Sequence, residues 1–197
     1  MAYRDLRHFL AALESAHELR YVDKRVSAEL EIGGIGRKLD DDRGPAVVFN
    51  NVQGYGHRVV MGIFGTTMKR IAMAMECEED ELLQVWLDRA RTFVEPKLVE
   101  RGPCQENVVL GDDVKLTEVV PPIRWHNVDG GPYITFALFF SKDPETSAGN
   151  MSIYRLMMTG DRRMGAYLQA PQHGATAFLR AERMGKPLEV AIVIGTD

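Results

Sequence analysis

Cysteine is scarce in this chain. Only Cys77 and Cys104 occur, and their spacing pairs them in no recognisable way, so we expect two free thiols in a reducing cytoplasm. No apolar run is long enough to span a membrane, and the N-terminus lacks the apolar stretch of a signal peptide. Lys and Arg form no basic stripe and the net charge is −4, which argues against a nucleic-acid-binding surface. These absences favour a cytoplasmic globular protein, and 197 residues suffice for one domain or one and a half.

The N-terminal half combines helical and strand patterns, which predicts an α/β part over residues 1–115. Residues 5–19 place apolar side chains at helical spacing, and residues 45–64 predict a hairpin or two neighbouring strands. Three further helices are predicted at 27–39, with Ser27 as a possible cap, at 66–77 and at 78–94. The last of these has an apolar face that consists of Leu82, Leu83, Trp86, Ala90, Phe93 and Val94.

The second half is rich in strand patterns. Residues 95–122 are punctuated by Pro and Gly and predict an irregular linker. The strand-like runs that follow are 133–141, 150–158, 164–170 and 188–195, the last apolar throughout and therefore expected to be buried on both faces. Pro171 predicts the first turn of a helix that runs to about Met184, where Gly185 stops it.

Polar residues interrupt the strand at 150–158. Asn150 and Ser152 are two positions apart and should share a face, whereas Arg155 should point the other way. Asn150 could simply cap a turn. Burying a guanidinium is costly without an anion, so Arg155 either forms a salt bridge, lies on an exposed edge, or meets a phosphate, a carboxylate substrate or a flavin.

His173 follows the predicted start of a helix, although a single histidine is usually structural or exposed. The positive end of the helix dipole disfavours imidazolium there, and the free N–H groups of a helix N-terminus can bind phosphate. A neutral imidazole together with the Asn150 carbonyl suits Mn²⁺ or Mg²⁺ at a phosphate better than Zn²⁺. Such a site also needs a carboxylate, and spacing marks out none of the 28 Asp and Glu residues.

The motif "GNMSIYR", followed further on by "PQH", resembles the signature of the UbiD family of reversible decarboxylases. "PPIRWHNVDGGPYIT", "GPAVVFNNVQGYGHRVVMGIFG" and "VSAELEIGGIGRKL" resemble other segments of the family, so the likeness covers the whole chain. The early segments are most similar to the branch that acts on hydroxylated aromatic acids. The resemblance implies prenylated FMN, held through its phosphate by Mn²⁺ and K⁺. It also implies that residues 116–197 begin a flavin-reductase-like split β-barrel, which makes the expected fold class α/β (α+β).

The resemblance assigns roles to individual residues. Asn150 and His173 match two metal ligands, and the Met151 carbonyl matches a K⁺ ligand. Cofactor contacts are matched by Thr135, Ser152, Ile153, Tyr154, Arg155 and Gln172. Arg155 also matches the arginine that works with two glutamates in catalysis. Those glutamates and the metal-binding glutamate have no counterpart before the chain ends at Asp197, so we expect the N-terminal portion of an enzyme, inactive alone.

The implied substrates are aromatic or α,β-unsaturated carboxylic acids, with CO₂ as the other product. A complete protein of this kind is expected to form a homo-oligomer, either a dimer or a hexamer, without nucleic-acid or membrane partners. Two alternatives stay open: a non-catalytic split-barrel module that binds flavin or a nucleotide, and a subunit of a multi-chain decarboxylase whose partner supplies the glutamates.

Overall fold

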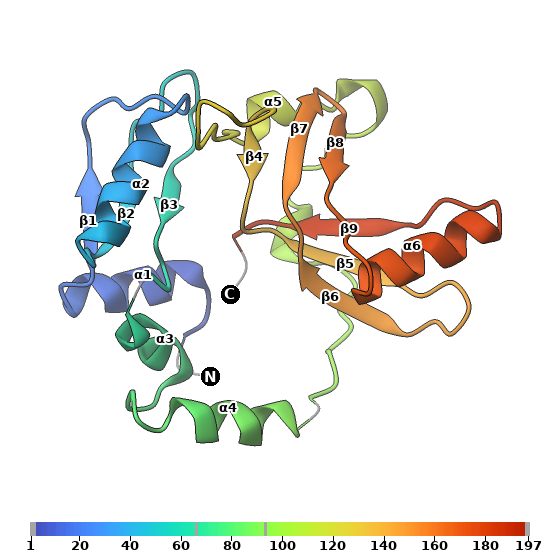
Figure 1. Ribbon diagram of the computed structural model, residues 1–197, viewed down its shortest axis with the longest axis horizontal. Helices are drawn as coiled ribbons and strands as arrows, with labels where there is room; N and C mark the ends of the chain where they lie inside the picture. Colours follow the sequence, from blue (N-terminus) through green and yellow to red (C-terminus); the bar gives the residue numbers. More distant parts are fainter. Residues whose placement is uncertain (1–2, 66, 93, 196–197) are drawn as a thin grey trace.

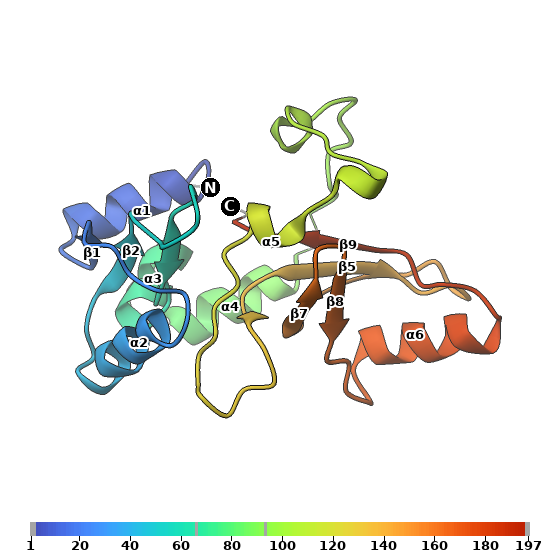
Figure 2. The ribbon, with the colours of Figure 1, turned by 90° about the horizontal axis from the view of Figure 1, so that it is seen from above.

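The computed structural model describes residues 3–65, 67–92 and 94–195. Figures 1 and 2 show an N-terminal part and a strand-rich second part side by side, with α4 leading from the first toward the second. The elements of the N-terminal part are α1 (Leu6–Ser15), β1 (Leu19–Val22), α2 (Glu31–Asp41), β2 (Ala46–Phe49), β3 (Val59–Met61), α3 (Met68–Met75) and α4 (Leu82–Ala90).

Strand β2 is the centre of the N-terminal part. It pairs in parallel with β1 and antiparallel with β3, and all four of its residues are buried. Val47 and Phe49 belong to a core cluster with Ile32 of α2, whereas Ala46 and Val48 belong to one with the apolar stripe of α1. Because successive side chains of a strand point to opposite faces, this sheet is covered on both sides. The neighbouring strands predicted within 45–64 are confirmed, and β1 was not predicted.

A buried ion pair anchors α3 to this sheet. Arg70 is 2% exposed, and its Nη1 donates to Oε2 of Glu18 over 2.7 Å, while Lys69 binds the other carboxylate oxygen at 2.8 Å. The hydrogen bond from Lys69 lowers the pKa of Glu18, burial acts in the opposite direction, and Arg70 lowers it further. The result is a carboxylate held ionised against the guanidinium.

Two predicted helices differ in detail. Helix α2 begins at Glu31, with Leu30 rather than Ser27 in the cap position, because the Glu31 carboxylate accepts the Ser27 N–H and holds residues 27–30 as a turn. Helix α4 forms, yet none of its residues is buried, and Trp86 is 62% exposed. Residues 66 and 93, which belong to the predicted helices 66–77 and 78–94, lie outside the described residues.

The second part contains two three-stranded sheets, with strand orders β4-β7-β8 and β6-β5-β9. Residues 95–122 are mostly irregular, as predicted. The elements are short 3-10 turns at Pro103–Gln105 and Gly111–Asp113, α5 (Leu116–Val119), β4 (Tyr133–Ile134), β5 (Leu138–Lys142), β6 (Gly149–Ile153), β7 (Leu156–Gly160), β8 (Arg163–Ala166), α6 (His173–Arg183) and β9 (Val190–Val193). The fold is therefore a mixed α/β arrangement. The division between residues 115 and 116 stays a prediction.

Two strands that were predicted as continuous are each divided between the sheets. The run 133–141 splits into β4 and β5, and the run 150–158 splits into β6 and β7. Strand β6 pairs with β5, whereas β7 pairs with β4 and β8. The alternation of inward and outward side chains continues through the second break, so the residue pattern alone does not reveal where the hydrogen-bonding partner changes.

Two predictions about the C-terminal elements, the place of Pro171 and the burial of the last strand, are wrong. Pro171 precedes α6 rather than lying in its first turn, because Gln172 is the N-cap and His173 the first helical residue. Strand β9 is not buried on both faces: it pairs only with β5 among the described residues, and Val190 is 45% exposed. Gly185 adopts φ +63° just after the helix, as its predicted role as a stop requires.

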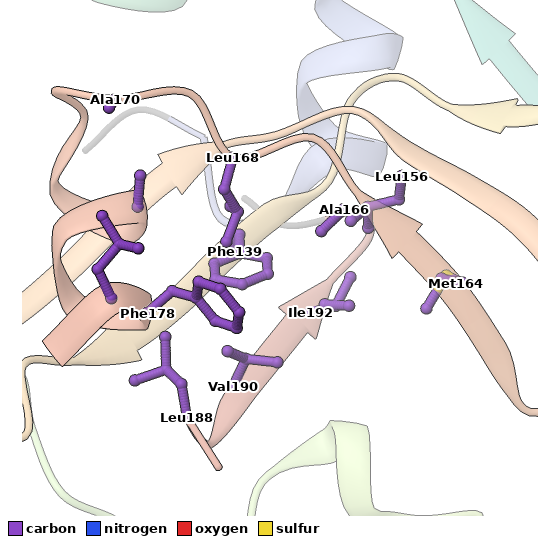
Figure 3. A pocket seen from close by; sticks show the side chains of 12 residues that line it. Phe139, Leu156, Met164, Ala166, Leu168, Ala170, Phe178, Leu188, Val190 and Ile192 are labelled. Carbon is purple, nitrogen blue, oxygen red and sulfur yellow. The ribbon is translucent and has the colours of Figure 1, made fainter. Parts of the chain in front are cut away.

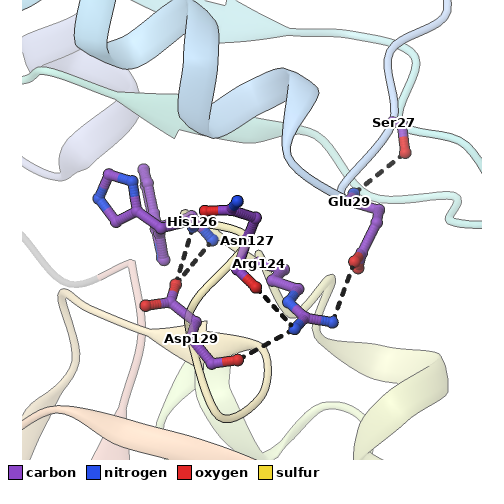
Figure 4. A network of polar contacts seen from close by, with 7 residues as sticks. Ser27, Glu29, Arg124, His126, Asn127 and Asp129 are labelled. Carbon is purple, nitrogen blue, oxygen red and sulfur yellow. Dashed lines mark hydrogen bonds and ion pairs between the residues drawn. The ribbon is translucent and has the colours of Figure 1, made fainter.

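A polar network joins the two parts (Figure 4). The guanidinium of Arg124 forms an ion pair with Glu29 at 3.3 Å and donates to the backbone carbonyl of Asp129 at 3.0 Å. The chain then packs on α2 so closely that a Cβ on Gly33 would lie 2.6 Å from the carbonyl oxygen of Trp125. Gly33, one of the glycines that weaken the helical pattern of α2, thus permits the contact. No helix within the described residues is long and apolar enough to cross a membrane.

Candidate functional site

Two segments distant in sequence line one pocket of about 450 Å³. The end of β6 and the turn after it contribute Ser152, Ile153 and Tyr154. The start of α6 contributes Pro171, Gln172 and His173. Five of these six residues are candidates from the sequence, and Pro171 is the addition. The structure therefore brings the "GNMSIYR" and "PQH" motifs together, although they are separated in the sequence.

Tyr154 fixes how the two segments meet. Its side chain is 4% exposed, and its ring packs edge-on against Phe139 with centroids 5.1 Å apart. Its hydroxyl accepts the backbone N–H of Gly174, the second residue of α6, over 3.0 Å. A Cβ on Gly174 would lie 2.5 Å from that hydroxyl, so the approach requires glycine. Gly174 was not identified from the sequence, where only a glycine in the first turn of a helix could have signalled it.

Asn150 and Ser152 share a half-buried face of β6, as predicted. The Ser152 hydroxyl donates to the Asn150 side-chain oxygen over 3.3 Å, and the Asn150 amide nitrogen is buried without a partner among the described residues. The oxygen and nitrogen of an amide can exchange places in such a network. With the amide turned, its nitrogen donates to Ser152 and its oxygen takes the position without a partner. A cation or a donor would satisfy that oxygen.

His173 lies at the exposed N-terminus of α6. The side chain of the N-cap residue Gln172 makes no capping hydrogen bond, so the first turn keeps N–H groups without an intrahelical acceptor; that of Gly174 already donates to Tyr154. These groups and the helix dipole favour an anion such as phosphate. The described residues contain no group of three His, Cys, Asp or Glu side chains that could hold a metal ion. Asn150 and His173 therefore suit a metal only if other groups complete its coordination.

The remaining candidates lie outside the pocket lining. Arg155 is exposed and points away from the face shared by Asn150 and Ser152; its guanidinium lies 5.8 Å from the ring centroid of Tyr133. Within the described ranges no carboxylate forms an ion pair with it, so the salt-bridge alternative has no support. Met151 is exposed on the opposite face of β6, and Thr135 lies in the break between β4 and β5.

Two models of known protein families match most of this chain. Residues 10–90 match the family model of the 3-octaprenyl-4-hydroxybenzoate carboxy-lyase N-terminal domain, and residues 97–197 match that of the Rift-related domain of the same carboxy-lyases. A phenolic acid decarboxylase from Bacillus subtilis is 32% identical over 100% of this chain and 44% of its own length.

Solved structures of related enzymes are also similar in fold to this chain. An evolved dimeric form of the UbiD-class enzyme HmfF from Pelotomaculum thermopropionicum, in complex with prFMN, superposes with a TM-score of 0.91 and 33% identity over 98% of this chain and 45% of that one. The vanillic acid decarboxylase of Sedimentibacter hydroxybenzoicus in closed form superposes with a TM-score of 0.90 and 32% sequence identity. The match covers 100% of this chain and 44% of that one. The chain thus spans less than half the length of these relatives.

Proposed function

Because the chain belongs to the UbiD family, we propose that it is the cofactor-binding portion of a reversible decarboxylase that acts on aromatic or α,β-unsaturated carboxylic acids through prenylated FMN. The observation that carries this proposal is the pocket in which the end of β6 faces the N-terminus of α6. It offers an anion-binding helix end beside neutral donor side chains, which suits a phosphate held by a divalent cation.

The roles proposed for single residues are those that the resemblance to the family implies. Asn150 and His173 bind Mn²⁺ through an amide oxygen and an imidazole nitrogen, and the Met151 carbonyl binds K⁺. Ser152, Ile153 and Tyr154 form the strand side of the phosphate site. Tyr154 acts through its backbone, because its hydroxyl is already bonded to α6. Gln172, Thr135 and Arg155 are the remaining proposed cofactor contacts, and Arg155 is proposed to meet the flavin rather than the phosphate.

Arg155 is the proposed catalytic residue. When bound, prenylated FMN supplies the covalent chemistry that stabilises the electrons left behind as CO₂ departs. Arg155 holds the substrate carboxylate, since its planar guanidinium can form two parallel hydrogen bonds to a carboxylate. Its side chain has no carboxylate partner among the described residues, so it is available for this contact. The protons of the reaction must be handled by groups that this chain has not been shown to contain.

The test is flavin binding by this chain with and without Mn²⁺. We expect weak binding of Mn²⁺ alone, because two neutral ligands attract a cation poorly, and tighter binding when FMN or prenylated FMN is present. His173→Ala and Asn150→Ala should each weaken the Mn²⁺-dependent flavin affinity about tenfold or more, as losing a ligand does. His57→Ala, a histidine change in an exposed loop, is the matched control.

Arg155→Ala should separate the two proposed roles. In this chain it should leave Mn²⁺-dependent flavin binding close to normal, because the guanidinium lies outside the phosphate pocket. In a catalytically complete form, Arg155→Ala and Arg155→Lys should both abolish or severely reduce decarboxylation, because lysine keeps the charge but loses the planar pair of donors. Near-normal turnover of Arg155→Ala at normal flavin occupancy would refute the catalytic role. Flavin affinity that is indifferent to Mn²⁺ and to His173 would refute the proposed site.

A second candidate is a subunit of a multi-chain decarboxylase, since the three-residue acidic or histidine cluster missing from the described residues could be completed by another chain. A partner chain would then supply the carboxylate ligand and the glutamates. Purification from the native source under mild conditions distinguishes the candidates: a stoichiometric second polypeptide supports the multi-chain form, and a single longer polypeptide supports the first.

A further inference from the structure

Two buried polar atoms without partners belong to directly opposite residues of strands β5 and β6. They are the hydroxyl oxygen of Ser141 and the amide nitrogen of Asn150, and neither forms a hydrogen bond within the described residues. Ser141 and Asn150 are paired in the register of these antiparallel strands. Burying a polar group without a partner costs free energy, so two such groups on opposed residues require an explanation.

The register places both side chains on one face of the sheet. Phe139 and Ser141 are the buried residues of β5, and their cross-strand neighbours Ser152 and Asn150 are the half-buried residues of β6. Phe139 lines a pocket together with Phe178 of α6 (Figure 3). The face that carries Ser141 and Asn150 is therefore the one against which α6 lies.

The described surroundings of Ser141 leave Asn150 as its natural partner. On its other side Ser141 pairs with Val190 of β9, whose side chain has no polar atom. Two residues further along the chain, the Asp143 carboxylate already accepts hydrogen bonds from Arg180 and from two backbone N–H groups. The buried residues of α6 also have no polar side-chain atom; they are Gly174, Ala175, Ala177 and Ala181.

The distance across the strand pair suits a hydrogen bond. Directly opposite residues of antiparallel strands have Cβ atoms about 4.5–5.5 Å apart, so rotation about side-chain bonds alone can bring an amide and a hydroxyl into contact. A hydroxyl both donates and accepts, and it can therefore bond to either end of an amide. One end of the Asn150 amide already has such a neighbour, because its oxygen lies 3.3 Å from the Ser152 hydroxyl.

We propose that Ser141 is a positioning residue for the cation ligand Asn150: its hydroxyl bonds to the end of the amide that faces away from Ser152. The two serines then hold the amide from both ends. This role rests on the proposed function, because it requires the Asn150 oxygen to bind the cation. An amide that is free to turn presents nitrogen as well as oxygen, and only the oxygen is a ligand for a hard cation.

The first measurement is the Mn²⁺-dependent flavin affinity of this chain. Ser141→Ala should weaken it about tenfold, as the loss of a group that orients a metal ligand does. In an Asn150→Ala background the same change should alter affinity by less than about twofold, because the amide that Ser141 positions is gone. Ser141→Thr keeps the hydroxyl and should retain more affinity than Ser141→Ala. Flavin affinity without Mn²⁺ should stay the same in all of them.

Thr67→Val is the matched control. The Thr67 hydroxyl is also buried without a hydrogen-bond partner, but it belongs to the N-cap residue of α3 in the N-terminal part. Valine has nearly the shape of threonine without the hydroxyl, so the change removes the same kind of group far along the chain from β5 and β6. Mn²⁺-dependent flavin affinity should be unchanged in this variant.

The second measurement is urea unfolding without metal or flavin. A hydroxyl bonded to Asn150 stabilises the chain, so Ser141→Ala should lower the urea midpoint, and it should lower it less in the Asn150→Ala background. A hydroxyl that is buried without a partner destabilises the chain, so a midpoint raised by Ser141→Ala would overturn the pairing.

The affinities separate the two levels of inference. Normal Mn²⁺-dependent affinity in Ser141→Ala, with losses in His173→Ala and Asn150→Ala, would overturn the role of Ser141 and leave the proposed function standing. Equal losses from Ser141→Ala with and without the Asn150 amide would also overturn that role. Flavin binding by the unaltered chain that is indifferent to Mn²⁺ would refute the proposed site, and the role of Ser141 with it.

Discussion

Replacing Gly174 with alanine should disturb the contact that positions the candidate site. The new Cβ would lie 2.5 Å from the Tyr154 hydroxyl and 2.8 Å from its ring carbon Cε2. The tyrosine has little room to retreat, because it is 4% exposed and packs on Phe139. Overpacking of this kind costs about 1–3 kcal/mol, and the better helix propensity of alanine returns at most about 1 kcal/mol. We expect a net loss of about 1–2 kcal/mol from these two effects.

A double-mutant cycle tests the cause of that loss. Tyr154→Phe removes the acceptor of the buried Gly174 N–H and should cost about 1–3 kcal/mol. In the double variant the nearest clashing atom is absent, so the two costs should not add, and the coupling free energy should be about 0.5 kcal/mol or more. Gly34→Ala is the control for adding a methyl group to a helix, because a Cβ there meets nothing within 4 Å.

Urea denaturation followed by circular dichroism measures each stability, and flavin titration with Mn²⁺ measures the effect on the site. Both affinity and stability should fall in Gly174→Ala, because a displaced α6 carries His173 with it. Full stability in Gly174→Ala, or strict additivity with Tyr154→Phe, would refute the reasoning.

Three further outcomes follow from the N-terminal part. Gly33→Ala should lower the free energy of unfolding by about 1–3 kcal/mol, because its Cβ would meet backbone that cannot rotate away, whereas Gly34→Ala should raise it by about 0.5–1 kcal/mol. Thermal or urea unfolding measures both changes, and equal effects would contradict the close approach of Trp125 to Gly33. Glu18→Gln should lower the free energy of unfolding by roughly 3 kcal/mol, because it leaves the buried Arg70 guanidinium without its counter-ion. Arg70→Met should lower it by less, because it removes that charge. A larger loss in Arg70→Met than in Glu18→Gln would count against the ion pair as described. Because the pKa of Glu18 is lowered on folding, its contribution to stability is present above the ordinary carboxyl pKa of 4.5 and disappears as pH falls through the folded-state pKa. The difference in free energy of unfolding between wild type and Glu18→Gln should therefore narrow on acidification. A difference that is independent of pH would refute the linkage.

Local periodicity determined much of the fold. The apolar stripe of α1, the strands at 45–64 and the stop at Gly185 depend on neighbours along the chain, so short patterns reveal them. The shared face of Asn150 and Ser152 follows from the two-residue period of any strand. The family motifs also singled out two segments, "GNMSIYR" and "PQH", that line one pocket in the structure.

Partners distant in sequence decided the rest. An apolar strand such as β9 has the same pattern at an edge as in the middle of a sheet, and an apolar helix face such as that of α4 does not reveal whether anything covers it. The division of 150–158 into β6 and β7 occurs because the hydrogen-bonding partner changes while the side-chain alternation does not. Gly174 owes its importance to a tyrosine twenty residues earlier. Such contacts depend on three-dimensional packing, so only the tertiary structure could decide them.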